Sequence, residues 1–128
     1  MSTRSVLASA TLIPLALGLG VSAPAQASHG GTAVRTGGCS GSSHWTLKAK
    51  PDDGRIEVEG EIDSTPSGQV WHWTFRHNGS RSASGRATTS GTSHSFEVRR
   101  RMADLAGTDH VAFRATHGRQ VCRGSIAL

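Results

Sequence analysis

The sequence lacks the short motifs that usually carry hydrolytic or metal chemistry. It contains no G-x-S-x-G nucleophile elbow, no H-E-x-x-H zinc motif and no pair of catalytic cysteines. Histidine is frequent, with seven in the chain, yet no two histidines have the spacing of a zinc motif. We therefore predict a protein that is not an enzyme and that needs neither a cofactor nor a metal ion.

Large apolar residues and cysteines are also scarce. After residue 27, only 15 of 101 residues are Leu, Ile, Val or Phe, a share low enough to make disorder an alternative. Their strict alternation with polar residues favours a fold with a thin core. The two cysteines, Cys39 and Cys122, would strengthen that core, because a bridge closing an 84-residue loop contributes about 4.5 kcal/mol. Two cysteines in an exported chain most often pair with each other, and pairing between molecules is the alternative.

A long apolar run occurs once, near the N-terminus, and has the layout of a signal peptide. Val6 to Val21 is almost wholly apolar, follows the basic Arg4 and precedes Ala25-Gln26-Ala27, which fits the A-x-A rule of signal peptidase. A membrane anchor is the alternative, but 16 residues with a proline inside are short for a span of about 20. The sequence thus predicts that residues 1–27 are removed and that the remaining chain is secreted and extracellular, without membrane attachment.

From residue 39 onward the dominant pattern is an alternation of apolar and polar residues with period two. This is typical of strands that have one buried face, and turn signals such as Asp53-Gly54 and Asn78-Gly79 separate the alternating stretches. Seven strands are predicted, at residues 43–50, 55–63, 69–77, 80–89, 93–101, 109–116 and 120–127. The pattern favours an all-β, seven-stranded antiparallel β-sandwich of the immunoglobulin-like type over residues 39–128, with a small β-barrel as the alternative.

Two segments are predicted to lie outside the strands. Residues 28–38 contain four glycines and one sizeable apolar residue, Val34, and are predicted to form a flexible arm. Met102 to Gly107 has helical spacing of its apolar residues but is too short for an independent helix, so we expect one short helical turn at a corner.

The arrangement resembles immunoglobulin and fibronectin type III domains in architecture. The resemblance rests on the pair Trp71 and Trp73 on the third predicted strand, on Asp104 to Gly107 at a corner, and on seven strands within about 85 residues. The cysteines do not lie on the second and sixth predicted strands, and no tyrosine is present to form a tyrosine corner. The likeness therefore concerns architecture, and such folds serve many unrelated functions.

Short stretches spread over nearly the whole mature chain carry a second resemblance. They are Cys39-Ser40, Trp45 to Lys48, Asp53 to Glu59, Gly68-Gln69 with Trp71, Asn78-Gly79, Ser95 to Arg100, and Asp104, Ala106 and Gly107 with Asp109. In these stretches the chain resembles a group of small secreted actinobacterial proteins. The resemblance implies export and a disulfide, and it implies no chemistry, because that group has no established activity.

The chain is basic, with a net charge of +5, and arginine makes up most of its basic residues. We expect most arginines to lie on alternating strand positions beside acids, which argues against a nucleic-acid partner. If the first, second and fifth predicted strands are neighbours, their outer face has three charged columns that neutralise one another. The columns are Lys48 and Lys50, then Glu57, Glu59 and Glu61, then Arg99 and Arg101. A cation site on the glutamates is the alternative. The excess of basic over acidic residues favours weak attraction of the protein to anionic cell-wall polymers.

Tryptophan and histidine supply further candidates for a binding site. Most tryptophans should fill the core, but Trp71 is nearest the loop at 65–68 and is the best single candidate for a partly exposed binding residue. His72 and His110 are predicted on the outer faces of adjacent strands, where a weak transition-metal site is the alternative to simple exposure. Together with Arg99 and Arg101 they make up the candidate binding residues.

These observations predict a monomeric, secreted binding module without enzymatic activity. Its expected partner is an anionic cell-wall polymer or another extracellular protein. The alternative is an inhibitor of proteases or other enzymes that acts through an exposed loop, either residues 65–68 or residues 90–92.

Overall fold

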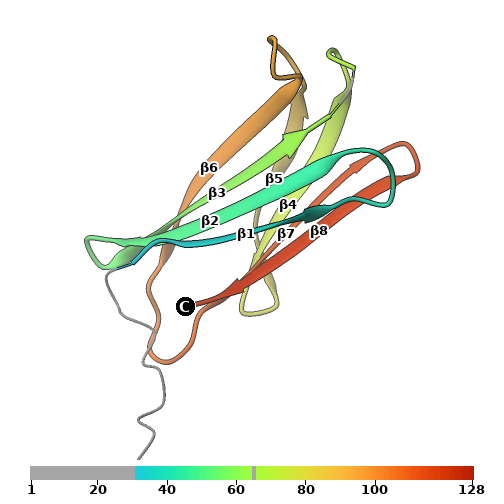
Figure 1. Ribbon diagram of the computed structural model, residues 1–128. Coiled ribbons are helices and arrows are strands. Elements are labelled where there is room, and N and C mark those ends of the chain that lie inside the picture. The colour runs from blue at the N-terminus through green and yellow to red at the C-terminus, as the bar shows by residue number, and fades with distance from the viewer. Residues whose placement is uncertain (1–30, 65) are drawn as a thin grey trace, which may run out of the picture.

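The computed structural model describes residues 31–64 and 66–128, and these residues form strands and turns (Figure 1). The predicted signal peptide, residues 1–27, lies outside the described residues. Within them, no helix is long and apolar enough to cross a membrane. The strands are β1 (Ala33–Gly38), β2 (His44–Asp52), β3 (Arg55–Asp63), β4 (Val70–His77), β5 (Ser80–Thr88), β6 (Ser95–Ala103), β7 (His110–His117) and β8 (Gln120–Ala127).

The strands make two antiparallel sheets that pack face to face (Figure 1). Sheet A has the order β1-β2-β3-β6, and sheet B has the order β5-β4-β7-β8. The predicted β-sandwich is therefore confirmed, and the barrel alternative is wrong because neither sheet closes on itself. The seven predicted strands correspond to β2 through β8, and the expected neighbours β2, β3 and β6 lie side by side.

The prediction of a flexible arm over residues 28–38 is wrong for β1. This strand pairs with β2 from Ala33 opposite Ala49 to Gly38 opposite His44. The segment has no alternating apolar pattern. It is held on β2 by backbone hydrogen bonds, which do not require particular side chains. Gly37 in β1 also allows close packing, since a Cβ atom there would lie 2.7 Å from Trp45 Cζ2.

The expected helical turn at Met102 to Gly107 is also wrong. Strand β6 continues through Ala103, and the loop that follows contains no helix. The loop is held at its start by a bond from the Asp104 amide to the Gly54 carbonyl, at 3.3 Å. Met102 is buried as an inward-facing strand residue, which accounts for the apolar spacing that suggested a helix.

Tight turns set the register of two hairpins. Asp53 and Gly54, between β2 and β3, have φ values of 49° and 72°. Asn78 and Gly79, between β4 and β5, have φ values of 49° and 84°. Two consecutive positive φ angles are what a type I′ hairpin turn requires, so the turn signals in the sequence are confirmed.

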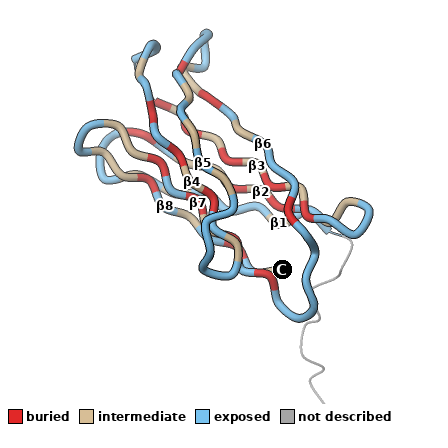
Figure 2. The backbone as a smooth tube through the Cα atoms, turned by 180° about the vertical axis from the view of Figure 1, so that it is seen from behind, coloured by how far each residue is buried: buried red, intermediate tan, exposed pale blue. Residues whose placement is uncertain are grey.

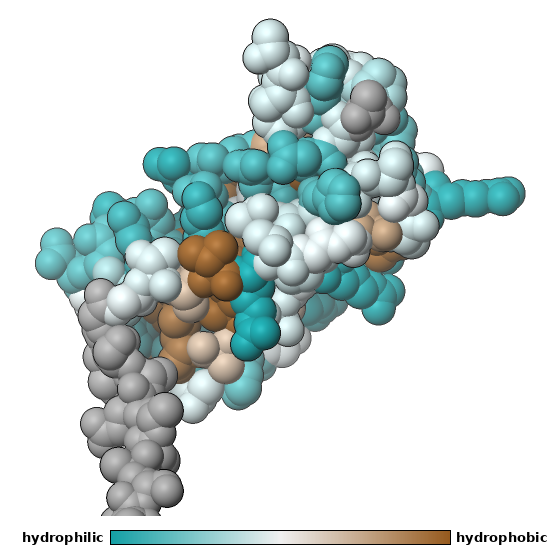
Figure 3. Space-filling view, in the orientation of Figure 1, coloured by the Kyte–Doolittle hydropathy of each residue, from teal (hydrophilic) through white to brown (hydrophobic). Residues whose placement is uncertain are grey.

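The core lies between the two sheets, along the inward faces that Figure 2 shows as buried. Its largest members are Trp71, Trp73, Phe75, Phe96 and Phe113, with aliphatic residues from both sheets around them. In the view of Figure 3 apolar side chains gather mainly at the lower left, and most of the remaining visible surface is polar or neutral.

The predicted disulfide between Cys39 and Cys122 is present. It joins the end of β1 to β8, and Cys122 is fully buried in the core. The Ser40 amide donates to the Val121 carbonyl at 2.9 Å beside it. Sheet A and sheet B are thus linked covalently at the edge where β1 and β8 meet.

Candidate functional site

The outer face of sheet A neutralises its own charges, as predicted. Glu59 lies opposite Lys48 on one side and Arg99 on the other, with N–O distances of 3.7 Å and 3.1 Å. Arg101 contacts Asp52 at 2.8 Å. The carboxylates of Glu97 and Glu59 raise the pKa of Arg99 above its usual value. Arg99 and Arg101, two candidate binding residues, are therefore engaged within their own sheet.

Oxygen atoms of Glu59, Glu61 and Glu97 lie within 4.8 Å of one another. Arg99 Nε contacts two of these side chains, with 3.1 Å to Glu59 Oε2 and 2.8 Å to Glu97 Oε1. A guanidinium thus already provides the positive charge beside this cluster, which does not support the cation-site alternative.

Glu61 should respond to pH, because its carboxyl is partly buried and lies near other acids, including Glu97 directly opposite it. Burial raises the pKa of Glu61, and the nearby Asp63 and Glu97 raise it further. A carboxyl whose pKa is higher in the folded state stabilises the fold at low pH, and this contribution is lost as pH rises through that pKa.

We therefore expect Glu61→Gln to lose less stability than the wild type between about pH 4 and pH 7, by a few tenths of a kcal/mol. Thermal melting across this pH range measures the difference. Glu57→Gln is the control, because Glu57 lies between Lys50 and Arg101 and its removal should lower stability at neutral pH. Equal effects of the two substitutions would contradict the prediction.

Three other candidate residues do not come together as a site. Trp71 was predicted to be partly exposed, but it is fully buried, because the chain after the loop enters β4 beneath Phe96 of the opposite sheet. His72 and His110 both face outward on adjacent strands, yet His72 pairs with Thr116, six positions along β7 from His110. At about 3.4 Å per residue the two histidines are roughly 20 Å apart, too far to share a metal ion.

The two loops considered for an inhibitor contact each other. Ser67 Oγ donates to the Gly91 carbonyl at 3.2 Å and also contacts His94 Nδ1. The Gly68 amide donates to the Thr89 carbonyl at 2.7 Å. These bonds hold the described parts of both loops together, and the inhibitor function stays a prediction.

Sheet B has a charge distribution unlike that of sheet A. The strands of sheet A carry seven basic and six acidic residues, whereas the strands of sheet B carry five arginines and no acid. All five are exposed, and their outer surface is called the arginine face from here on. The residues are Arg76, Arg81, Arg86, Arg114 and Arg123. The expectation that arginines lie beside acids is right for Arg99 and Arg101 of sheet A and wrong for sheet B.

Within the described residues none of these five arginines forms an ion pair. The acid nearest to sheet B along the chain, Asp109, is only 2% exposed. It contacts His77 Nε2 at 2.6 Å and accepts a bond from the Leu105 amide at 3.4 Å. Asp109 therefore does not neutralise the arginine face.

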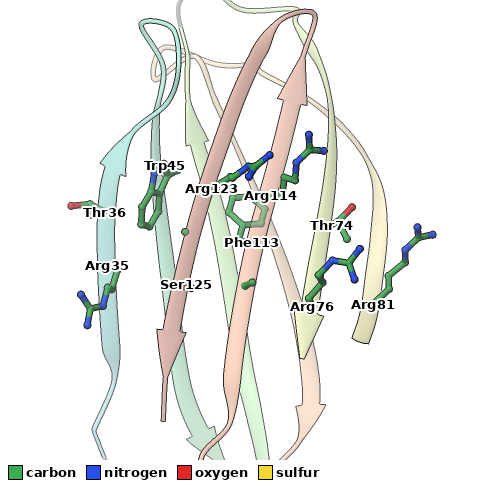
Figure 4. Close-up of a pocket in the computed structure, with 12 residues that line it drawn as sticks. Arg35, Thr36, Trp45, Thr74, Arg76, Arg81, Phe113, Arg114, Arg123 and Ser125 are labelled. Carbon is green, nitrogen blue, oxygen red and sulfur yellow. The ribbon is translucent and has the colours of Figure 1, made fainter. Parts of the chain in front are cut away.

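Four of the arginines form two pairs of like charge. Arg114 on β7 lies directly opposite Arg123 on β8, and Arg76 on β4 lies directly opposite Arg81 on β5. Figure 4 shows each pair on neighbouring strands. Like charges directly opposite each other destabilise a sheet, so the fold does not account for this arrangement.

A β-bulge in β5 brings Arg81 to the arginine face. Phe75 pairs with Ala83, but the register then shifts so that Arg76 pairs with Arg81 instead of Ser82. In an unbroken register Arg81 would share the inward face of Ala83. Bulges commonly redirect a side chain next to a functional site, and this one creates the second like-charged pair.

The two pairs border an open groove of about 800 Å³ that continues to the edge of sheet A. Small residues, among them Ala112, Gly124 and Ser125, line the groove together with Phe113, whose side chain is buried in the core. Arg35 and Trp45 lie at its far end, where β1 and β2 of sheet A meet β8 (Figure 4). The groove thus combines guanidinium groups from four strands of the sandwich outer surface with one half-buried aromatic ring.

No family model, curated protein or solved structure matches this chain. Sequence reasoning missed the arginine face because Arg76 and Arg114 are far apart in the chain and become neighbours only through the pairing of β4 with β7. The one available signal was the absence of acids from residues 70–88 and 110–127.

Proposed function

We propose that this protein is a secreted, non-enzymatic module that binds anionic polymers through its arginine face. The supporting observation is the register that sets Arg76 opposite Arg81 and Arg114 opposite Arg123 without an acid between them. An anion bound between two opposed guanidinium groups replaces their repulsion by two charge-assisted contacts. The opposed guanidinium groups are then stabilised in the complex, and they repel each other when no anion is bound.

Sheet A supports this interpretation by contrast. There the same chain sets Lys48 opposite Glu59, Glu59 opposite Arg99, and Glu57 opposite Arg101. Apart from Glu61 opposite Glu97, the cross-strand charges in sheet A are therefore arranged as expected for stability. The opposite arrangement on sheet B is better explained by an external anion than by the fold.

The compartment fits the same proposal. The Cys39–Cys122 disulfide persists most readily in an oxidising environment outside the cytosol. An exported protein with such a face meets anionic cell-wall polymers as its first large source of negative charge. We therefore take a cell-wall polymer as the partner, in preference to another extracellular protein.

Binding to immobilised dextran sulfate at increasing salt tests the proposal. We expect Arg114→Gln with Arg123→Gln to bind about tenfold more weakly than the wild type, because each lost guanidinium removes a charge-assisted contact. The matched control is Arg99→Gln with Arg101→Gln, which removes the same charge from sheet A. This control variant should leave the immobilised dextran sulfate at the same salt concentration as the wild type. Equal weakening of both variants would show that net charge, rather than the arginine face, governs binding.

A further inference from the structure

The positions of the two arginine pairs and of Trp45 indicate which kind of anionic polymer the groove binds. This inference rests on the proposed function. We propose that the ligand is a linear anionic polysaccharide that crosses the strands of sheet B. Its sulfate or phosphate groups occupy the Arg76–Arg81 and Arg114–Arg123 pairs, and one of its sugar rings lies against Trp45.

The separation of the pairs requires an extended ligand. Arg76 lies opposite Ala112 in β7, two positions from Arg114. The midpoints of the two pairs are therefore two strand spacings apart across the sheet and one two-residue step apart along it. With strands about 4.8 Å apart and residues about 3.4 Å apart, the midpoints are about 12 Å apart. A single sulfate or phosphate cannot contact both pairs, but a chain that repeats its charges can.

The chemistry of the basic residues favours oxyanions, and their opposition in pairs favours an anion with more than two oxygens. All five basic residues in the strands of sheet B are arginine, and the two lysines of the chain both lie in sheet A. The guanidinium group presents a rigid fork of N–H donors that binds two oxygens of one anion, whereas an ammonium group acts as a point charge. Two such forks on neighbouring strands can donate to one sulfate or phosphate from both sides.

Trp45 gives the groove a place for an uncharged ring. Its indole lies between Gly37 of β1 and Gly124 of β8, where a side chain at either position would collide with it. The ring is therefore fixed in position at the end of the groove (Figure 4). The part of the indole that the two glycines leave uncovered lines the groove and can contact the apolar C–H face of a sugar ring. Arg35, beside it in the groove, can contact a further anionic group.

The same surface is less suited to nucleic acid. Proteins that hold single strands stack successive bases on several exposed aromatic side chains. Among the outward-facing residues in the four strands of sheet B, none is Phe, Trp or Tyr. Phe113 also lines the groove, but it is only 1% exposed and offers no ring for a base to stack on. Repeated charges with one aromatic contact therefore favour a saccharide chain over a polynucleotide.

Titration of the full-length wild-type protein with probes of increasing length tests the extended binding mode. The probes are inorganic sulfate, inorganic phosphate, and sulfated and phosphorylated dextran oligosaccharides of two and six sugars. We expect a six-sugar probe to bind at least about 100-fold more tightly than the inorganic ion, because one chain engages both arginine pairs. The better of the sulfated and phosphorylated six-sugar probes identifies the oxyanion. Equal affinity for the ion and for both six-sugar probes would overturn the inference and leave a single-anion site.

Trp45→Phe tests the sugar contact, with the melting temperature as the check on folding. We expect this variant to bind the six-sugar probe roughly fivefold more weakly, because the smaller ring loses contact with the sugar. Linear polyphosphate of equal charge, which has no sugar, should bind the variant and the wild type alike. In the wild type, the six-sugar probe should also protect tryptophan fluorescence from acrylamide quenching. If Trp45→Phe weakens both probes equally, the sugar contact is wrong.

Two further outcomes separate this inference from the proposed function. A single-stranded oligonucleotide that binds more tightly than a six-sugar probe of equal charge would overturn the saccharide assignment and keep the arginine face as an anion-binding surface. If no anionic probe binds better to the wild type than to Arg114→Gln with Arg123→Gln, both the inference and the proposed function fail.

Discussion

Replacing Cys39 and Cys122 together by alanine is expected to lower the free energy of unfolding by about 4.5 kcal/mol. The bond closes a loop of 84 residues, and without it the unfolded chain gains the conformational freedom that the loop restricts. Small domains are stable by only about 5–15 kcal/mol. The core here is thin, so the variant should be close to unfolding at ordinary temperatures.

Urea unfolding of the wild type and of the double alanine variant, each with and without a reductant, measures this effect. Alanine is chosen because Cys122 is fully buried and a serine hydroxyl there would be left without a partner. The reductant should destabilise the wild type and leave the variant unchanged. A loss smaller than about 1 kcal/mol would mean that the unfolded chain is already compact enough for the bond to matter little.

Much of the fold follows from the alternation in the sequence, because each sheet has one face against the core. Strands β2 and β3 show this most clearly, since Ile56, Val58 and Ile62 are buried while the glutamates between them face outward. The neutralised outer face of sheet A follows from the same alternation once β2, β3 and β6 are neighbours. Local pattern and local turns were sufficient for this half of the molecule.

Strand β1 and the position of Trp71 could not be predicted in the same way. β1 forms because β2 offers an unpaired edge and because the disulfide holds the end of the segment against β8. Neither cause leaves an alternating pattern in Ala33 to Gly38. Trp71 follows a loop, which suggested exposure, but Phe96 from the opposite sheet lies 6.4 Å away between ring centroids. Both features depend on contacts between distant segments.

The arginine face depends on distant contacts to a still greater extent. Its pairs require the register of β7 with β8 and a one-residue bulge in β5, and a shift of one position would turn either arginine partner inward. Alternation in the sequence places arginines outward but does not say which of them become neighbours. Two of the candidate binding residues, Arg99 and Arg101, were therefore predicted on sheet A, where acids match their charges.

The close contact between Gly124 and Trp45 leads to the second large effect. Gly124→Ala is expected to lower the free energy of unfolding by about 3 kcal/mol, because a Cβ atom there would overlap the six-membered ring of Trp45. The ring cannot move toward β1, where it already lies against Gly37. The two sheets would have to separate at the edge that the disulfide also joins.

Gly38→Ala is the matched control, since a Cβ atom at Gly38 has no neighbour within 4 Å. It should change stability by less than about 0.5 kcal/mol. Combining Gly124→Ala with Trp45→Phe should recover part of the loss, because phenylalanine lacks the outer ring atoms that collide with the new methyl group. If Gly124→Ala and Gly38→Ala are equally mild, Trp45 is not fixed between the sheets. The sugar contact proposed for it would then lack its structural basis.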